Sequence, residues 1–418
     1  MAFLCKRPGM EKTTKHSIFF AGVLDLARER IQTSSQFDLL EALRCFQPFN
    51  ATLHVDKIYG LLGLLKTPHY VHIDYAMSPE RLYEVVCLTI IEHTQCLDVF
   101  LDCCRTQHSQ FPNLPSWVPD WSTTPPLGTS VRTTTAQERF SASRNTKASD
   151  SINSVRGKIT VPGHFLGTIA DVGICMPSSH ELQPPRNRIL YFRWVLEILT
   201  LPVTILESWK ATVTRRDDGH DATLLSRYTT GETLMDALYH TLYATGGPSP
   251  IFEEENSFNL MIDIQEWLLE LLQVTGKLRY PFQITPLALW PLAWLFCFPA
   301  FFLVTYWYGI VATWRFLRPA LRFGIEMGKE NNDPCRQTWT IGRTDCNLIG
   351  RFPAPGLTSA DALPSRVGDA IVIFKGGSRP YVIRRAGDCW RLVGSAYIHG
   401  IMYGAAFREE QCVDIELV

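Results

Sequence analysis

The chain has 418 residues, 46% of them hydrophobic and 19% charged, which predicts two or three globular domains and excludes a mainly disordered protein. Forty basic and 41 acidic side chains leave a formal net charge of -1, so no overall field favours nucleic acid, and no nucleic-acid partner is predicted. Twelve cysteines occur without a C-x-x-C spacing, and the N-terminus lacks the pattern of a cleavable signal. Scattered thiols of this kind fit a reducing compartment, where most would be buried and none would form a zinc site.

Residues 1–122 are predicted to form a helical region. In DKIYGLLGLL the apolar residues recur at helical spacing, and Asp56 is placed to cap the first turn. In SPERLYEVV, Ser78 as N-cap and Pro79 at the first helical position give a strong start signal for a second helix.

The helical region ends in the stretch LPSWVPDWS, residues 114–122, which we call the Trp-Pro segment. Pro115 and Pro119 favour an extended backbone, and Trp117 and Trp121 are expected to pack against the neighbouring helices. We therefore interpret the segment as a structural anchor. A proline-rich ligand for a partner is the alternative, although PSWVP lacks the P-x-x-P spacing.

The next part of the chain is predicted to contain a polar loop and then mixed structure. Residues 123–154 are rich in Ser, Thr and Arg and are expected to be a mobile surface loop. Residues 155–280 are expected to contain a strand pair turning at Pro162 and Gly163, followed by helices at 187–213, 228–244 and 256–274.

Residues 281–318 form an apolar, transmembrane-type segment. Its run 284–314 has 31 residues without a charged side chain, whereas about 20 suffice to cross a bilayer. Aromatic residues and a basic flank favour a membrane location, with a cytoplasmic location as the alternative. A buried or re-entrant hairpin broken at Pro291 and Pro299, or foreign sequence from an imperfect gene model, also fits.

Residues 335–418 alternate short β-branched runs with glycine-rich turns, which predicts a small antiparallel β domain. The predicted fold class is therefore α+β: helical N-terminal and middle regions, one apolar segment and a C-terminal β domain.

No motif in the sequence assigns a catalytic, cofactor-binding or metal-binding residue. The strings GGSRP and VGSAY lack the second glycine of a nucleophile elbow, and GIEMGKE is one residue too short for a phosphate-binding loop. His69 and His72, beside Asp74, have a spacing that metal ligands use, but no third ligand is evident. His399 and Asp369 are candidates for proton transfer, although both are interpreted as turn residues.

Four segments, in order, resemble the fungal heterokaryon-incompatibility (HET domain) proteins. They are DKIYGLLGLL, LPSWVPDWS, GDAIVIFKGG and LVGSAYIHGIM. The segment A-L-S-Y-x-W-G and the later W-x-x-Q-E, which belong to the family's N-terminal effector core, do not occur in the chain. The matched motifs are structural signatures without known chemistry, and they comprise Asp56, Ile58, Tyr59, Leu61, Leu62, Gly63, Pro115, Trp117, Pro119, Asp120, Trp121, Gly368, Asp369, Gly394, Tyr397, His399 and Gly400.

The resemblance implies a non-enzymatic protein of non-self recognition and programmed-cell-death signalling that binds other proteins of an incompatibility pathway. It implies a truncated relative of the family, without cofactors, whose possible membrane contact runs through 284–314. It also implies that the segment around Ile159 belongs with the C-terminal sheet, which a single bilayer crossing at 284–314 would prevent. The alternatives are a membrane-attached enzyme that uses His399 with Asp369 or His72 with Asp74, and an inert truncated relative.

Overall fold

The computed structural model describes the chain in several stretches. These are residues 21–25, 27–29, 31–32, 37–47, 49–65, 71–103, 111–123, 140–148, 152, 154–155, 157–174, 208–215, 222–243, 339–354 and 365–418. The apolar segment 281–318 and the helix expected at 256–274 lie outside the described residues. Among the helices that the structure does describe, none combines the length and the hydropathy needed to cross a membrane.

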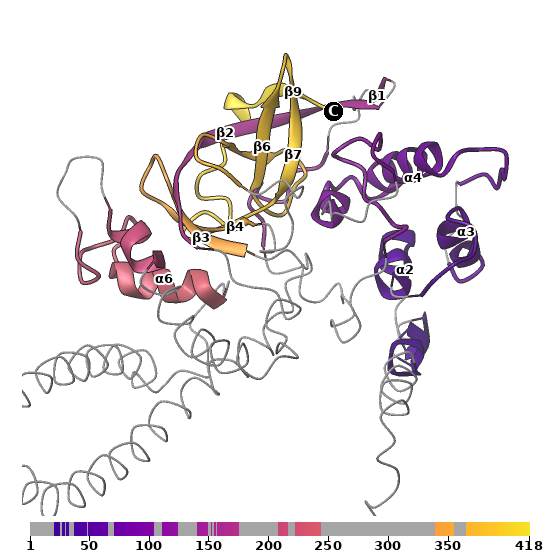
Figure 1. Ribbon diagram of the computed structural model, residues 1–418, viewed down its shortest axis with the longest axis horizontal. Helices are drawn as coiled ribbons and strands as arrows, with labels where there is room; N and C mark the ends of the chain where they lie inside the picture. Colours follow the sequence, from indigo (N-terminus) through magenta and orange to yellow (C-terminus); the bar gives the residue numbers. More distant parts are fainter. Residues whose placement is uncertain are drawn as a thin grey trace, which may run out of the picture. The chain divides into compact units, whose positions relative to one another are not determined.

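Short helices form most of the N-terminal region, and two further helical stretches, 208–214 and α6, precede the last strands (Figure 1). The named helices are α2 (Leu39–Phe46), α3 (Asp56–Leu62), α4 (Pro79–Thr94), the 3-10 helix η1 (Asp98–Asp102), α6 (Leu234–Tyr243) and the 3-10 helix η5 (Glu409–Gln411). The start of α4 is as predicted, since Ser78 Oγ accepts the amide of Arg81 at 3.4 Å and Pro79 is the first helical residue. The predicted cap of α3 is wrong: its N-cap is Val55, and no side chain caps it.

The strands form one mixed, nine-stranded sheet. They are β1 (Ser154–Val155), β2 (Lys158–Val172), β3 (Trp339–Thr344), β4 (Ile349–Pro353), β5 (Ala370–Phe374), β6 (Tyr381–Ala386), β7 (Cys389–Ser395), β8 (Tyr397–Ile398) and β9 (Val413–Leu417). All pairs are antiparallel except β7 with β9. Because β2 pairs with both β9 and β5, the strands β2, β5, β6, β7 and β9 close into a ring of five.

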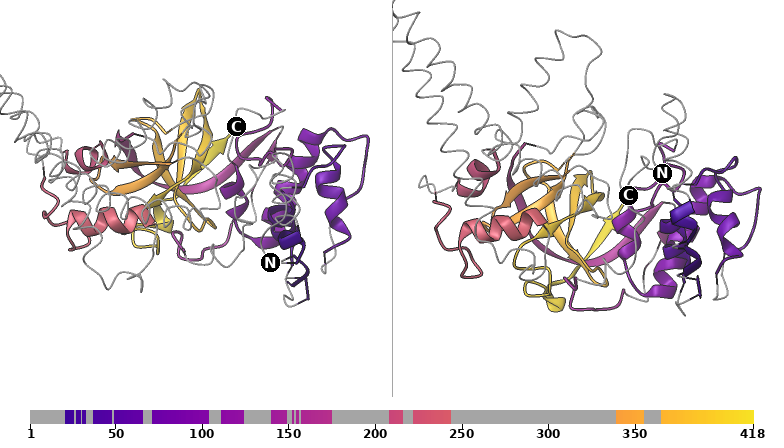
Figure 2. Two further views of the ribbon diagram at one scale, coloured as in Figure 1. Left: turned by 60° about the horizontal axis from the view of Figure 1, so that its bottom comes forward. Right: turned by 90° about the horizontal axis from the view of Figure 1, so that it is seen from below.

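These pairings overturn the predicted fold class. The C-terminal sheet is not a small antiparallel domain of residues 335–418, because β2 runs through it as a long strand (Figures 1 and 2). The expected strand pair is also wrong, since β2 continues without a turn through Pro162 and Gly163. A Cβ on Gly163 would lie 2.8 Å from side-chain atoms of Ile415 and Val372, so this glycine makes room inside the ring rather than a turn.

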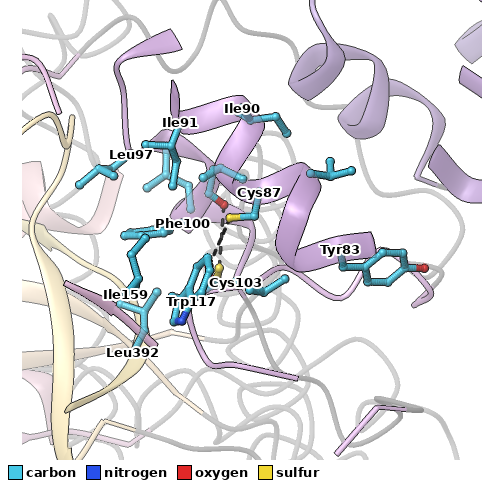
Figure 3. Close-up of a cluster of buried hydrophobic side chains, with 14 of the residues drawn as sticks. Tyr83, Cys87, Ile90, Ile91, Leu97, Phe100, Cys103, Trp117, Ile159 and Leu392 are labelled. Carbon is cyan, nitrogen blue, oxygen red and sulfur yellow. Dashed lines mark hydrogen bonds between the residues drawn. The ribbon is translucent and has the colours of Figure 1, made fainter. Parts of the chain in front are cut away.

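The main hydrophobic core joins the helices to the ring of strands. It contains buried side chains from α2, α3, α4 and η1 together with Ile159, Val372 and Leu392 from the strands. Trp117 is fully buried between the two sets: in Figure 3 it lies between Ile159 and Leu392 of the sheet and Cys87 of α4. The helices and the sheet therefore share one interior and are not separate folding units.

Hydrogen bonds of the Trp-Pro segment to backbone groups reinforce this junction between the helices and the sheet. The indole N–H of Trp117 donates to the carbonyl of Gly157 at 3.0 Å, just before β2. The amide of Ser116 donates to the carbonyl of Val418 at 3.0 Å, and its hydroxyl accepts the amide of Leu392 at 2.9 Å. The segment thus contacts β7 and the residues that directly precede β2 and follow β9.

Part of the stretch that was expected to be mobile packs against the sheet. In 140–148, Ala142 and Ala148 are buried. The amide of Ala142 donates to the carbonyl of Ser378 at 3.0 Å, and the amide of Ala148 donates to the carbonyl of Gln95 at 2.8 Å. The polar composition of 123–154 therefore does not exclude order at its C-terminal end.

Replacing Trp117 with Ala should lower the free energy of unfolding by about 3–5 kcal/mol, because it leaves a cavity between helices and sheet. Urea unfolding monitored by circular dichroism would measure this change. Trp117→Phe, which keeps an aromatic ring but loses the indole N–H and part of the buried volume, should cost less, about 1–3 kcal/mol. Leu225→Ala is the matched control, since Leu225 is 76% exposed; an equal loss in Trp117→Ala and the control would contradict the shared core.

Candidate functional site

A group of titratable side chains surrounds His399, one of the residues singled out in the sequence. We call it the His399 cluster, and it comprises Tyr228, Glu232, His240, Tyr397 and His399. Two of these residues come from β8 and the turn after it, and three come from α6 and the turn before it. The cluster therefore lies where residues 222–243 pack against the sheet.

The turn after β8 fixes the position of His399. The amide of His399 donates to the carbonyl of Ile349 at 2.9 Å, which holds the residue beside β4. Gly400 has a φ of +91°, and a Cβ at this position would lie 2.8 Å from Cγ2 of Thr230. Only glycine accommodates both the positive φ and this close approach, so the signature glycine brings the histidine against the 222–243 segment.

Both nitrogens of the His399 ring have partners. Nε2 contacts the carboxylate of Glu232, and Nδ1 lies 3.3 Å from the hydroxyl of Tyr397. The ring also stacks on His240, with centroids 5.3 Å apart and an angle of 5° between the planes. We infer a neutral ring whose Nε2–H donates to Glu232 and whose Nδ1 accepts from Tyr397.

Burial lowers the pKa of His399 below 6.5; Glu232 acts in the opposite direction, and the neighbouring His240 lowers the pKa further. Burial also raises the pKa of Tyr228 to about 12 and that of Tyr397 well above its ordinary value. Both tyrosines are therefore protonated near neutral pH. The cluster holds an imidazole and a carboxylate that could transfer protons, but no activated nucleophile.

Tyr228 ties the cluster to the backbone of the sheet. Its hydroxyl donates to the carbonyl of His399 at 3.2 Å and accepts the amide of Ile349 at 2.9 Å. The side chain is buried and lies beside the His399 ring at 5.7 Å between centroids. Through these contacts the cluster holds residues 222–243 against the sheet, which is a structural role beside any chemistry of the histidine.

The proton-transfer pair His399 and Asp369 is not formed. The carboxylate of Asp369 accepts two hydrogen bonds of 2.7 Å from Arg384 and one of 2.7 Å from the amide of Arg366. The carboxylate at His399 is instead that of Glu232. Sequence reasoning missed Glu232, which is 167 positions away from His399 in the chain.

In the second suggested pair, His72 with Asp74, the aspartate has a structural role. Asp74 Oδ1 accepts the amide of Ala76 at 2.9 Å, while the backbone of Asp74 bonds to the hydroxyl of Tyr59. His72 is exposed, and His69 lies outside the described residues. Within the described stretches no group of three or more His, Cys, Asp or Glu side chains is placed to hold a metal ion.

The other signature residues lie mainly in buried or turn positions. Ile58, Tyr59 and Leu62 are buried in the main core, and Leu61 packs against it. Gly63 is the C-cap of α3, and Asp56 accepts a hydrogen bond of 3.0 Å from Tyr75. In the remaining motifs, Pro119 and Trp121 are buried, Pro115 and Asp120 are half-buried, Gly368 precedes β5 and Gly394 lies in β7.

Lys57, inside the first motif, is a buried charge that sequence reasoning did not single out. Its Nζ donates to the carbonyl of Gln47 at 3.1 Å and to that of Phe49. Burial lowers its pKa to about 8, and Asp120 opposes this shift. The lysine therefore links α3 to the turn after α2 and carries an electrostatic interaction with the Trp-Pro segment.

Replacing the buried Asp369 with Asn should destabilise the protein by about 3 kcal/mol, because it leaves the half-buried Arg384 without its carboxylate. A double-mutant cycle with Arg384→Met, measured by chemical denaturation, would isolate the pair. The double variant should be more stable than Asp369→Asn alone. Additive losses would show that the two side chains do not interact.

The lowered pKa of His399 predicts a pH dependence of stability. Below pH 6.5 the unfolded chain binds this proton before the folded chain does, so the free energy of unfolding falls as the pH falls. Denaturation midpoints between about pH 7 and about pH 5 would measure the slope. His399→Gln should reduce the slope, whereas His72→Gln, at an exposed position, should retain it; identical slopes in all three proteins would contradict the assignment.

The chain was compared with models of protein families, with curated protein sequences and with solved structures, and none of them matches it. The resemblance to HET-domain proteins therefore depends on the motifs in the sequence and on the places that these motifs occupy.

Proposed function

We propose that the chain is a HET-related protein of non-self recognition and programmed-cell-death signalling that acts through contacts with other proteins. One observation carries the proposal: all four motifs, far apart in sequence, contribute to the same core, the fourth through Leu392. Ile58 comes from the first motif, Trp117 from the second and Val372 from the third, and all three are completely buried. Motif residues that pack in one interior are suited to stabilising a framework that carries binding surfaces.

The location of β2 supports the same proposal. The resemblance implies that the segment around Ile159 belongs with the C-terminal sheet, and Ile159 pairs with Leu417 of β9. The fourth motif also extends beyond this core, because His399 and its neighbours hold residues 222–243 against the sheet. Each motif thus has a role in assembling one framework.

Two large exposed side chains beside α3, Leu53 and Tyr75, are candidates for partner contacts. Leu53, one turn before α3, is 52% exposed, and Tyr75 is 62% exposed. Tyr75 is held in place because its ring packs on Tyr59 at 5.2 Å between centroids and its hydroxyl donates to Asp56. A fixed, exposed aromatic side chain loses little conformational entropy on binding, which favours protein recognition.

A second candidate function is an enzyme that uses His399 with Glu232. The half-buried imidazole, its carboxylate partner and the adjacent Tyr397 hydroxyl are the observations that favour it. In this case His399→Gln would abolish the biological effect without unfolding the protein. In the protein-contact proposal the same variant would keep the effect.

The test is expression of the full chain in fungal strains of compatible and incompatible genotype, with cell viability and co-purifying proteins as readouts. Wild type should lower viability and retain a partner only in the incompatible strain. Leu53→Ser combined with Tyr75→Ser should lose both effects, because it removes the exposed apolar contacts while leaving the core intact. Leu225→Ser, also at an exposed leucine, is the matched control. Equal viability in both genotypes, with no partner in either, would refute the proposal.

A further inference from the structure

Three reactive side chains meet where strands β2, β7 and β9 run together. Lys158 is the first residue of β2, Cys389 is the first of β7, and Glu416 lies near the end of β9. Lys158 Nζ lies 3.2 Å from Cys389 Sγ and 2.5 Å from Glu416 Oε1, and Cys389 Sγ donates to the same oxygen at 3.1 Å. The amine and the thiol are thus in contact, and one carboxylate holds both.

This contact crosses the least paired junction of the five-stranded ring. β9 pairs with β2 over five residues but with β7 at only one position, Trp390 with Leu417. Lys158 and Cys389 therefore lie on strands that flank β9 on either side. A covalent bond between them would close the ring where its hydrogen bonding is weakest.

The site lies at the surface through its amine and carboxylate, while the cysteine is largely buried beneath them. Cys389 is 9% exposed, while the side chains of Lys158 and Glu416 are 49% and 42% exposed. We expect hydrogen peroxide, because it is small, to reach this sulfur more readily than a bulky thiol reagent does. The thiol is free, so it is available for oxidation.

We propose that Cys389 and Lys158 form an oxidation site in which hydrogen peroxide joins Sγ to Nζ as a sulfenamide. In the first step peroxide oxidises the thiol to a sulfenic acid and is reduced to water. In the second step the neutral amine of Lys158 attacks the sulfur, the S–O bond breaks, and the hydroxyl leaves with a proton from nitrogen as water. The product has an S–N bond and two hydrogens fewer than the starting pair. This inference does not depend on the proposed function.

Lys158 controls when the bond forms. Its hydrogen bonds to Glu416 and Cys389 raise its pKa, and the amine must lose a proton before it can attack sulfur. The sulfenamide should therefore form faster as the pH rises. Capture by the amine also diverts the sulfenic acid from irreversible oxidation to the sulfinic acid, so a thiol such as dithiothreitol can restore the free pair.

The bond would act on the junction between helices and sheet. The carbonyl of Trp390, next to Cys389, accepts the amide of Val418, and the carbonyl of Val418 accepts the amide of Ser116 in the Trp-Pro segment. Joining β2 to β7 would fix the strand ends that this segment contacts. We therefore expect the oxidised protein to unfold at a higher temperature than the reduced protein.

The experiment treats the purified full chain with increasing hydrogen peroxide, blocks remaining thiols and analyses tryptic peptides without reduction. Trypsin should release residues 386–391, with Cys389, joined to a peptide that starts at Gly157 and is uncut after Lys158. The joined peptide should lack two hydrogens, form faster at higher pH and disappear after dithiothreitol. Thermal unfolding of the same samples should show the increase in stability.

Lys158→Arg keeps the positive charge but should not give the joined peptide, and Cys389→Ser should not give it either. Cys346→Ser is the matched control, because it removes an exposed cysteine elsewhere and should leave the product unchanged. The proposal is overturned if wild-type Cys389 accumulates as sulfinic acid with normal cleavage after Lys158, or if the joined product retains an added oxygen. Equal unfolding temperatures before and after linkage would overturn the stabilising role.

Discussion

Strand β2 is hydrogen bonded along both of its edges, and this double pairing is the constraint on which the rest of the structure depends. Its first half pairs with β9, its middle with β5 and its end with β3. The strand forces segments that are about 200 residues away in the chain to fold with it. The contacts between distant segments carry a cost in chain entropy, which the shared hydrophobic interior offsets.

The Trp-Pro segment connects this ring to the helices. A buried ion pair between two helices and a hydrogen bond from η1 to the sheet add to this connection. Arg44 of α2 binds Asp102 of η1 at 2.8 Å, with 4% and 8% of their side chains exposed. Asp98 of η1 then accepts the amide of Ser378, between β5 and β6. Such pairs specify a geometry more than they add stability, because the energy of desolvating the charges offsets much of their attraction. Helix α2 is thereby held in register with a turn of the sheet.

Polar side chains at the candidate sites have partners within the chain. His399 binds Glu232, Asp369 binds Arg384, and Lys57 binds backbone carbonyls. In the function that we propose, such a framework would hold surfaces for partner proteins. Lys158 and Cys389 differ from these groups, because their contact lies near the surface and places a nucleophilic amine against an oxidisable sulfur.

The sequence by itself determined features that depend on neighbouring residues. The N-cap at Ser78, the proline that follows it and the burial of both tryptophans could all be inferred from local patterns, because helix starts and apolar side chains obey short-range rules. Only the tertiary structure decided that Pro162 and Gly163 continue a strand and that Glu232, not Asp369, lies beside His399. Strand partners and ion pairs are selected by chain segments far apart in sequence, and no local pattern records which segments meet.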